Sequence, residues 1–363
     1  MRLQRVVSRG FRNLADLDRG VPAVGVVLLG ANAQGKTNLL EAIYYPVLCR
    51  SFRGSADREV VGGGKPGFSV EAYFVEACFD SEAVSVTATY SGQTYSGQRK
   101  RITVNGCPVG RLADAVGRWL AVAFLPADVG LASGPAGERR QYLDRVLSLA
   151  DRRYLRALTA FRAALAQRNS ALRQGRPDLA QAFNGALAAA GSALVRGRLD
   201  WLAGAAEQFA AELDCLGEHE PASLTYHGRV ELADASAWDE VLRASLAEDR
   251  ARGTTTAGPH RDDLLLEVRG RRLREFGSTG QHRSAAIALK LLELATLSRN
   301  RGTEPALLLD DVFAELDAER QRRLAVRLLG SRNRQVFVTS PRRDELPANL
   351  DLPVWVVEGG EVR

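Results

Sequence analysis

A glycine-rich octapeptide near the N-terminus has the residue types that bind a chain of phosphates. It reads GANAQGKT, from Gly30 to Thr37, and it follows the apolar run VGVVLLG. The octapeptide fits G-x-x-x-x-G-K-[ST], the Walker A pattern, in which glycines let backbone N–H groups point inward at phosphate oxygens. The helix expected after the loop adds its positive N-terminal end. We therefore expect a nucleotide site formed by Gly30, Ala31, Asn32, Ala33, Gln34, Gly35, Lys36, Thr37 and Asn38.

Polar side chains at two places in the chain have distinct expected roles at such a site. Lys36 would reach the β and γ phosphates of ATP as a catalytic residue, and the Thr37 hydroxyl would bind Mg²⁺. The stretch ALLLDDVF offers a buried strand, residues 306–309, that ends in two carboxylates. Asp310 would hold Mg²⁺ through water, as in a Walker B motif. Asp311 would position the attacking water as the second catalytic residue.

The separation between the two motifs indicates the fold. Thr37 and Asp310 are 273 positions apart (310 minus 37), which is much farther than in simple P-loop kinases and GTPases. A large, mainly helical segment must therefore be inserted between the two halves of one ATPase core, which is the layout of ABC-type heads. We expect an α/β fold: an ABC-type P-loop ATPase head with an inserted helical lobe and no long coiled coil.

A third motif precedes the carboxylate pair Asp310-Asp311 in the sequence. The residues Ser278-Thr279-Gly280-Gln281 are followed by a helical pattern and resemble the ABC signature, whose core is S-G-G-Q. A serine hydroxyl, a glycine N–H and a helix N-terminus together form an anion site. By this resemblance Ser278, Gly280 and Gln281 would cap the γ-phosphate held by the P-loop of a partner chain. The stretch AELD after the carboxylates resembles the D-loop, with Asp317 at the dimer interface.

The elements that position these residues fall into two groups. Alternating and apolar runs predict strands and one P-loop helix over the first 125 residues, where the helical pattern is interrupted at Pro46 and a hairpin turns at Asn105-Gly106. The chain then becomes Ala/Leu/Arg-rich, with helical periodicity broken near residues 175–177. A further single helix is expected over residues 237–253. We expect a discontinuous ATPase lobe of residues 1–125 and 300–363, and a mainly helical lobe of residues 126–299 that carries the signature motif.

Composition sets broad limits on the class of protein. The 363 residues are 45% hydrophobic and 25% charged, with a formal net charge of +6, which is an ordinary globular balance with a mild preference for anionic partners. The four cysteines are scattered without a CxxC pair, so we expect no metal framework, no disulfide framework and a cytoplasmic location. No run approaches the ~18 apolar residues of a membrane span.

Across essentially its whole length the sequence resembles the RecF family of bacterial recombination mediators. The resemblance depends on a set of short stretches, of which GPHRDDL is the most particular to that family. These stretches are FRNL (Phe11–Leu14), GANAQGKTNLLEAI, RSFRG (Arg50–Gly54), FLPADV (Phe124–Val129), ERRQYLDR (Glu138–Arg145), GPHRDDL (Gly258–Leu264), GSTGQHR and LLLDDVFAELD.

The resemblance implies a function in replication-coupled DNA repair. It implies a weak, DNA-stimulated ATPase that binds duplex DNA next to a single-stranded gap as an ATP-dependent homodimer. It also implies joint action with RecR and RecO in loading RecA, and a part in the SOS response. Arg12 would contact the nucleotide, as matching residues do in related heads. Basic residues would contact DNA phosphates without reading bases, with Arg50, Arg53, Arg58, Arg99, Lys100 and Arg101 as candidates.

Two departures from ABC chemistry bear on the rate of hydrolysis. Asp311 stands where transporters usually carry Glu, and its shorter side chain would lie farther from the water. The stretch VFVTS offers Thr339 and Ser340 where ABC heads usually have a switch His. Neither hydroxyl is a general base, so we expect slow hydrolysis in which ATP times the lifetime of the dimer.

Three other readings remain at this point. An ABC transporter ATPase subunit would share the P-loop and signature, but the absent switch His and GPHRDDL argue against it. A scaffold with a vestigial nucleotide site is disfavoured because Lys36, Thr37, Asp310 and Ser278 are all present. A repair head of the SMC or Rad50 type would require long arms, for which the chain is too short.

Overall fold

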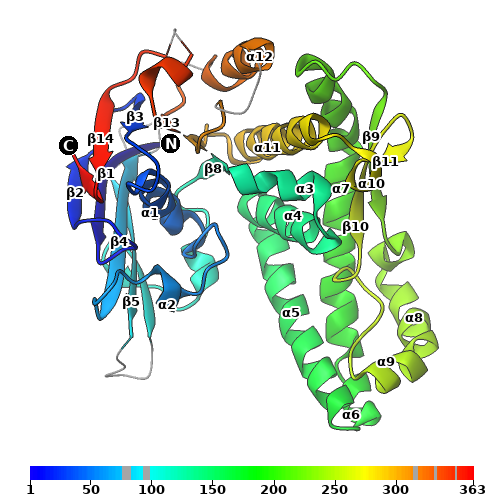
Figure 1. Ribbon diagram of the computed structural model, residues 1–363. Coiled ribbons are helices and arrows are strands. Elements are labelled where there is room, and N and C mark those ends of the chain that lie inside the picture. Colours follow the sequence, from blue (N-terminus) through cyan, green and yellow to red (C-terminus); the bar gives the residue numbers. More distant parts are fainter. Residues whose placement is uncertain (76–82, 93–98, 314–317, 331–332, 348–349) are drawn as a thin grey trace. The chain divides into compact units, whose positions relative to one another are not determined.

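A computed structural model describes residues 1–75, 83–92, 99–313, 318–330, 333–347 and 350–363 (Figure 1). The chain divides into two compact units. The first contains Met1–Ala127 and Leu297–Arg363, and the second contains Asp128–Thr296. The division of the chain into ATPase and signature-bearing lobes stays a prediction, with which these bounds are compatible.

The first unit contains a mainly parallel sheet whose central strands are buried. Every residue of β8, β12 and β13 is buried, which explains why β8 and β12 are unbroken apolar runs and why β13 begins with three apolar residues before Thr339 and Ser340. The strand order is β15-β14-β3-β13-β12-β8, and only β15 is antiparallel to its neighbour. Their bounds are β3 (Gly25–Leu29), β8 (Ala121–Phe124), β12 (Ala306–Leu309), β13 (Val336–Ser340), β14 (Val354–Glu358) and β15 (Glu361–Val362).

A second sheet in this unit is antiparallel, in the order β2-β1-β4-β5-β6-β7. Strand β4 alternates half-buried and buried residues along its whole length, as its sequence pattern predicts. The hairpin between β6 and β7 turns at Asn105 and Gly106, which both have positive φ. The strands are β1 (Arg2–Arg9), β2 (Leu17–Gly20), β4 (Gly67–Val75), β5 (Val84–Ser91), β6 (Lys100–Val104) and β7 (Cys107–Pro108).

Helix α1 (Lys36–Leu48) contacts strands of both sheets, so it lies in the core of the first unit. All but two of its 13 residues are buried, which is why its sequence is apolar on every side. The predicted interruption at Pro46 is wrong, because the helix continues to Leu48 and ends at Cys49 in a left-handed conformation. Pro46 lies within the last turn, where it removes one hydrogen bond while the packing of the buried helix is retained.

The second unit is built on two long helices, α5 (Arg152–Arg173) and α7 (Asn184–Cys215), joined through the short α6 (Pro177–Gln181). Figure 1 shows α5 and α7 side by side, and the two helices contact each other. The break predicted near residues 175–177 is confirmed, because α5 ends at Arg173 and α6 begins at Pro177. Of the helices described, α7 is the longest at 32 residues, so no long coiled coil is present in this part of the chain. Two more helices precede α5, namely α3 (Gly130–Ser133) and α4 (Ala136–Ala150).

A three-stranded antiparallel sheet, in the order β11-β10-β9, completes this unit. The single helix expected over residues 237–253 is wrong, since α8 and α9 are separated at Ser245. Helix α11 begins in the second unit and its residues from Leu297 belong to the first. The bounds are β9 (Ala222–His227), β10 (Asp263–Val268), β11 (Arg271–Arg272), α8 (Trp238–Ala244), α9 (Leu246–Arg252), α10 (Leu273–Phe276) and α11 (Thr279–Arg301).

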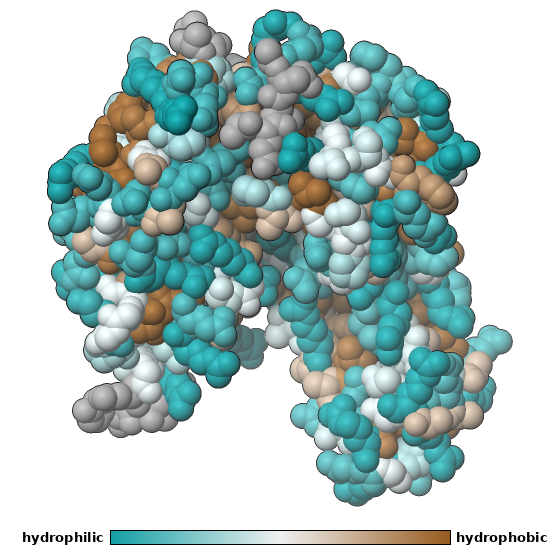
Figure 2. Space-filling view, viewed as in Figure 1, coloured by the Kyte–Doolittle hydropathy of each residue, from teal (hydrophilic) through white to brown (hydrophobic). Residues whose placement is uncertain are grey.

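The remaining elements are short, and none of the described helices has both the length and the apolar composition needed to cross a bilayer. Hydrophilic residues cover most of the face shown in Figure 2, as expected for a chain with 25% charged residues. These elements are α2 (Asp57–Val60), α12 (Ala318–Leu329), η1 (Leu112–Asp114), η2 (Pro126–Val129), η3 (Val230–Ala233), η4 (Ala235–Ala237) and η5 (Arg343–Glu345).

Candidate nucleotide-binding site

The glycine-rich loop connects β3 to α1, as its sequence predicts. Gly35 adopts φ 113° and Ala33 adopts φ 65°, so the chain curls sharply just before the helix begins at Lys36. Gly30 cannot carry a side chain here, because a Cβ would lie 2.2 Å from the carbonyl oxygen of Val357. The loop is therefore a compact turn at the N-terminus of a helix, which is the geometry that binds phosphate.

Lys36 is buried at this turn without a carboxylate partner. Its side-chain nitrogen donates to the carbonyl oxygens of Gly30 at 2.6 Å and Ala31 at 3.0 Å. Across the described residues, no carboxylate lies within ion-pair distance of this ammonium group. A buried cation that has only neutral dipoles around it provides a strong electrostatic attraction for an anion.

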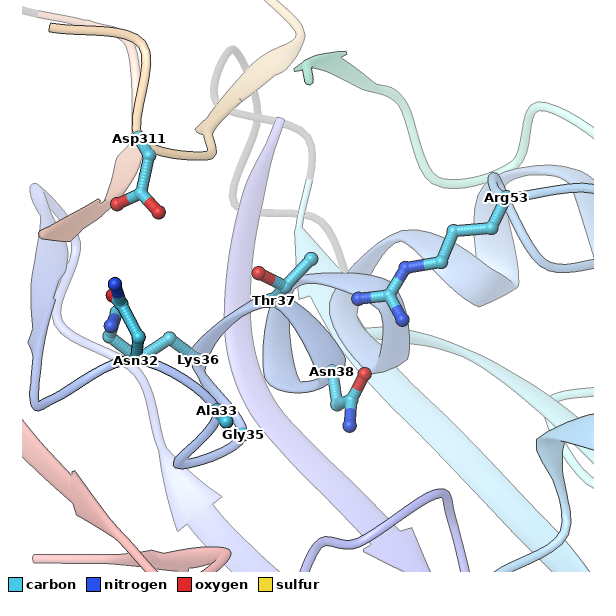
Figure 3. Close-up of a pocket in the computed structure, with 8 residues that line it drawn as sticks. All are labelled: Asn32, Ala33, Gly35, Lys36, Thr37, Asn38, Arg53 and Asp311. Carbon is cyan, nitrogen blue, oxygen red and sulfur yellow. The ribbon is translucent and has the colours of Figure 1, made fainter. Parts of the chain in front are cut away.

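A cavity of about 440 Å³ opens at this loop (Figure 3). In Figure 3 the carboxylate of Asp311 and the side chain of Asn32 point toward one another, while the guanidinium of Arg53 points toward Thr37 and Asn38. This volume lies within the range of ligand pockets. The cavity is lined by Asn32, Ala33, Gly35, Lys36, Thr37, Asn38, Arg53 and Asp311.

Thr37 and Asp310 meet beside the loop, although 273 positions separate them. The Thr37 hydroxyl donates to Asp310 Oδ1 at 2.9 Å, and Thr339 Oγ1 lies 2.9 Å from the same oxygen. Burial raises the pKa of the Asp310 carboxyl group, and the hydrogen bonds from Thr37 and Thr339 oppose that rise. Parallel pairing of β13 with both β12 and β3 brings the carboxyl ends of these strands, and the residues that follow them, to one edge of the sheet.

The arrangement fits a hard divalent cation. Oxygen donors from Thr37 and Asp310 are the ligands that Mg²⁺ prefers, and Mg²⁺ usually completes its shell with waters and substrate phosphates. In the described ranges no cluster of three or more His, Cys, Asp or Glu side chains could hold a metal by itself. A cation at this site would therefore depend on a phosphate-bearing ligand.

The hairpin of β14 and β15, which the pattern of the closing residues predicts, braces the loop, and sequence reasoning did not identify this contact. The N–H of Gly359 donates to Gln34 Oε1 at 2.6 Å, and the N–H of Gly360 donates to the Gln34 carbonyl at 2.9 Å. Gly360 has no room for a side chain, because its Cβ would lie 2.0 Å from the Asn13 carbonyl. The glycine pair in VVEGGEV was the available signal, but only the fold shows what it contacts.

Arg12 lies beside the P-loop helix rather than in the cavity lining. Its guanidinium makes a two-pronged pair with the fully buried carboxylate of Glu41, at 3.0 and 2.9 Å, and also donates to Ser55. Arg53, which the sequence suggested for DNA, instead lines the cavity with its Nε 3.7 Å from Glu41. A role for Arg12 in binding nucleotide stays a prediction, and Arg53 is the residue that the geometry adds.

The other basic candidates differ in how they are held. Lys100 is bound within the first unit, since its Nζ donates to Asp57 at 2.9 Å, to Tyr45 OH at 2.8 Å and to the Cys49 carbonyl at 2.5 Å. This network leaves the Lys100 ammonium with little capacity for DNA. The side chains of Arg50, Arg58, Arg99 and Arg101 are exposed.

The signature motif lies in the second unit, at the start of α11. Ser278 and Gln281 cap this helix reciprocally: the Ser278 hydroxyl accepts from the Gln281 N–H at 3.2 Å, and Gln281 Oε1 accepts from the Ser278 N–H at 3.0 Å. Ser278 is exposed and Gly280 half-buried. Asp317, the expected D-loop residue, lies outside the described residues.

The fold and the site together define an ATPase head of the ABC and SMC class. The family model for the RecF/RecN/SMC N-terminal domain matches residues 2–353. A solved SMC head bound to the C-winged helix domain of ScpA superimposes over 100% of this chain and 96% of its own with a TM-score of 0.58. At 15% identity, that likeness concerns the fold alone.

Closer relatives identify the family within this class. The DNA replication and repair protein RecF of Chloroflexus aurantiacus is 36% identical over 396 residues, covering 100% of this chain and 99% of that protein. The RecF protein of Geobacter sulfurreducens is 35% identical over 94% of this chain and 93% of its own length. A solved structure of the recombination mediator RecF-ATP in the RecFOR pathway has a TM-score of 0.87 at 30% identity, covering 100% of this chain and 97% of its own. The chain belongs to the RecF family.

Proposed function

We propose that this protein is an ATP-dependent DNA-binding protein of recombinational repair and replication restart. The observation that carries the proposal is the cavity at the P-loop, where the buried Lys36 has no carboxylate partner among the residues that the structure describes and Thr37 is bonded to Asp310. The relatives named as DNA replication and repair proteins, and the solved RecF-ATP structure, support the same function.

Each residue of the cavity has a role in this proposal. Backbone N–H groups of residues 30–35 and the ammonium of Lys36 bind the phosphates, and Arg53 adds a second cation at the cavity wall. Thr37 and Asp310 hold Mg²⁺, which supplies charge neutralisation at the phosphate oxygens when it is bound. Asn32 and Asn38 offer amide donors in the same lining.

We propose a weak ATPase that DNA stimulates. Asp311 lies in the cavity lining and would orient a water molecule with its carboxylate. Its side chain is short, and the buried hydroxyls of Thr339 and Ser340 that follow along β13 are not bases. Slow hydrolysis of ATP is expected from this set of groups. The lifetime of the ATP-bound dimer would then depend on how slowly its ATP is hydrolysed.

The signature motif would act on a second copy of the chain. In the described geometry the Ser278 oxygen accepts one hydrogen bond from the helix N-terminus, so its own hydroxyl proton stays available to donate to an oxyanion. The exposed position of Ser278 allows a partner to approach. We propose that Ser278, Gly280 and Gln281 contact the nucleotide of the partner chain in an ATP-dependent homodimer, with Asp317 at its interface.

DNA binding would depend on phosphate contacts at duplex/single-strand gap junctions. Arg50, Arg58, Arg99 and Arg101 are exposed and remain the candidates, because guanidinium groups bind phosphate without reading bases. Lys100 and Arg53 are weaker candidates, since one is held by Asp57 and the other faces the nucleotide cavity.

The wider role follows the relatives. The solved relatives are described within the RecFOR pathway, and on that basis we propose RecR and RecO as partners, loading of RecA as the outcome, and a part in the SOS response in the cytoplasm. The transporter alternative gains no support from relatives that are named for DNA replication and repair.

The test is binding to a fluorescent gapped duplex, measured by anisotropy with ATP, with ADP and without nucleotide. Lys36→Met removes the cation of the P-loop, and Ser278→Arg blocks the signature. Lys65→Met is the matched control, because Lys65 is an exposed lysine of the same unit. We expect tight binding only with ATP, loss in the first two variants, and wild-type behaviour in the control.

Two outcomes would contradict the proposal. Binding that ignores nucleotide and survives both substitutions would separate the ATP site from DNA, and the ATPase would then serve a protein partner. No binding at low salt, where phosphate contacts are strongest, would reopen the transporter reading.

A further inference from the structure

One buried hydroxyl, that of Thr339, lies between the two carboxylates that follow β12. Thr339 Oγ1 is 2.9 Å from Asp310 Oδ1 and 3.2 Å from Asp311 Oδ1. The residue is only 2% exposed, so water does not compete for these contacts. A single side chain on β13 therefore contacts both the cation-site residue and the residue expected to orient water.

The Thr339 hydroxyl uses its one proton and accepts one hydrogen bond. Its oxygen accepts the backbone N–H of Asp311 at 2.9 Å, and its one proton is shared between two carboxylate acceptors. Asp310 Oδ1 also receives the Thr37 hydroxyl. A continuous path of hydrogen bonds thus runs from the P-loop helix through Asp310 and Thr339 to Asp311.

The backbone of Asp311 needs such support. Asp311 has φ 49°, a left-handed conformation that a residue with a Cβ seldom adopts. Strained residues of this kind persist where neighbouring contacts over-determine them. The bond from the Asp311 N–H to Thr339 is a contact of this kind, and it fixes the direction in which the Asp311 side chain leaves the strand end.

The position of Thr339 is itself set by the sheet rather than by a loop. Strand β13 is paired in parallel with β3 on one side and β12 on the other, and Thr339 is opposite Leu28 of β3. All five residues of β13 are buried. The hydroxyl is therefore held on a rigid element, which is the arrangement that keeps a functional group in place.

We propose that Thr339 is a positioning residue that holds Asp311 in its left-handed conformation and couples it to the cation-site carboxylate of Asp310. The inference rests on the proposed ATPase function, because it deepens the account of that same site. Thr339 does not act as an acid or base. It determines the position of the Asp311 carboxylate when a cation is bound at the neighbouring Thr37–Asp310 pair.

The experiment compares Thr339→Val, which keeps the shape and removes the hydroxyl, with Thr339→Ser, which keeps the hydroxyl. Ser340→Ala is the matched control, because Ser340 is the next residue of β13, is 3% exposed, and bonds to Arg342 instead of the carboxylates. If the valine variant does not fold, Thr339→Ala removes the same group without branching.

We expect Thr339→Val to lower kcat for ATP about 10- to 100-fold while KM changes less than about threefold, since geometry is lost but phosphate contacts remain. Thr339→Ser should recover kcat to within about threefold of wild type, and Ser340→Ala should match wild type. Hydrogen exchange without nucleotide provides a second readout, because the Asp311 N–H should lose protection in the valine variant and keep it in the serine variant.

The inference is overturned if Thr339→Val keeps wild-type kcat, if KM rises as much as kcat falls, or if serine fails to rescue. A wild-type protein that neither binds nor hydrolyses ATP would defeat the proposed function instead. In that case the hydrogen-exchange comparison still decides whether Thr339 holds Asp311, since it requires no nucleotide.

Discussion

Two of the four lysines in this chain are buried, and their surroundings are opposite. Lys290, in helix α11, is 2% exposed and pairs with the fully buried Glu293 at 2.5 Å, while Arg145 approaches the same carboxylate at 3.0 Å. Lys36, in the P-loop, is 5% exposed, and within the described part of the chain its ammonium group donates only to the carbonyls of Gly30 and Ala31. The first charge is neutralised within the protein, whereas the second faces a cavity.

Both lysines are buried, so burial alone does not distinguish a charge with a structural role from a charge that binds a ligand. The distinction lies in whether the protein supplies an opposite charge beside it. Burial lowers the pKa of Lys290, and the charge of Glu293 opposes that change. Burial also acts to raise the pKa of Glu293, but Arg145 and Lys290 outweigh it and hold that pKa below its ordinary value. Among the described residues no such counter-charge accompanies Lys36, so an anion from outside is expected to complete its site.

The largest expected effect is at Lys36. Lys36→Met should weaken ATP binding at least about 100-fold, because the buried cation that faces the phosphates is lost. The free energy of unfolding without nucleotide should stay within about 1 kcal/mol of wild type, since no internal ion pair is broken. Isothermal titration with ATP and urea denaturation check both statements. Lys65→Met is the control. Unchanged ATP affinity in Lys36→Met would contradict the distinction drawn between Lys36 and Lys290.

The reverse result is expected at Lys290. Lys290→Met leaves Glu293 with Arg145 as its remaining partner, and should lower the free energy of unfolding by roughly 2 to 4 kcal/mol. ATP affinity should change less than about twofold. Thermal denaturation with and without ATP measures both quantities in one experiment. A stable variant with impaired nucleotide binding would show that the two lysines are not distinct in kind.

A smaller, pH-dependent effect is expected at His260, which is also partnered within the second unit. Its Nε2 bonds to the Thr255 carbonyl at 2.9 Å, and burial lowers its pKa from 6.5 to about 4. Between these two values the unfolded chain binds more protons, so stability is lost as pH falls from about 6.5 to about 4.

His260→Gln should therefore flatten the fall in stability across this window by about 1 to 3 kcal/mol, because glutamine keeps a donor but does not titrate. Urea denaturation of both proteins at pH 7.0, 5.5 and 4.5 measures the difference. Parallel curves for variant and wild type would show that His260 does not contribute to the pH dependence.

The smallest effect is expected at Ser278 in the isolated chain. Ser278→Ala removes the side-chain cap of α11 and should lower stability by about 1 kcal/mol. The comparison is sharpened by adding ATP: dimer formation, measured by light scattering, should be lost while ATP affinity of the monomer is kept. A variant that still dimerises would assign Ser278 to capping alone.

Sequence alone predicted the parts of the site that are contiguous or strongly patterned. The P-loop and the Asp310-Asp311 pair were found because their spacing and flanking apolar runs reflect local backbone geometry. The break at Ser245 and the helix continuing through Pro46 were not predicted, since packing decided both.

Side-chain partners from distant segments were the part that the sequence could not supply. Arg53 and Lys100 belong to one sequence-based list of candidates, yet one lines the nucleotide cavity and the other is held by Asp57. Both are basic residues, and nothing in their local sequence pattern predicts these different partners. Only the positions of α1, α2 and β6 do so.

The sequence by itself determined the chemistry that this protein carries, because residue types and short-range spacing fix which groups can bind phosphate and where a helix can begin. The tertiary structure decided which of those groups are free to act. It brought Arg145 of α4 against the Lys290–Glu293 pair of α11 and left Lys36 facing a cavity. The physical reason is that a buried charge must be compensated, and the compensating group comes from wherever the fold brings the chain together.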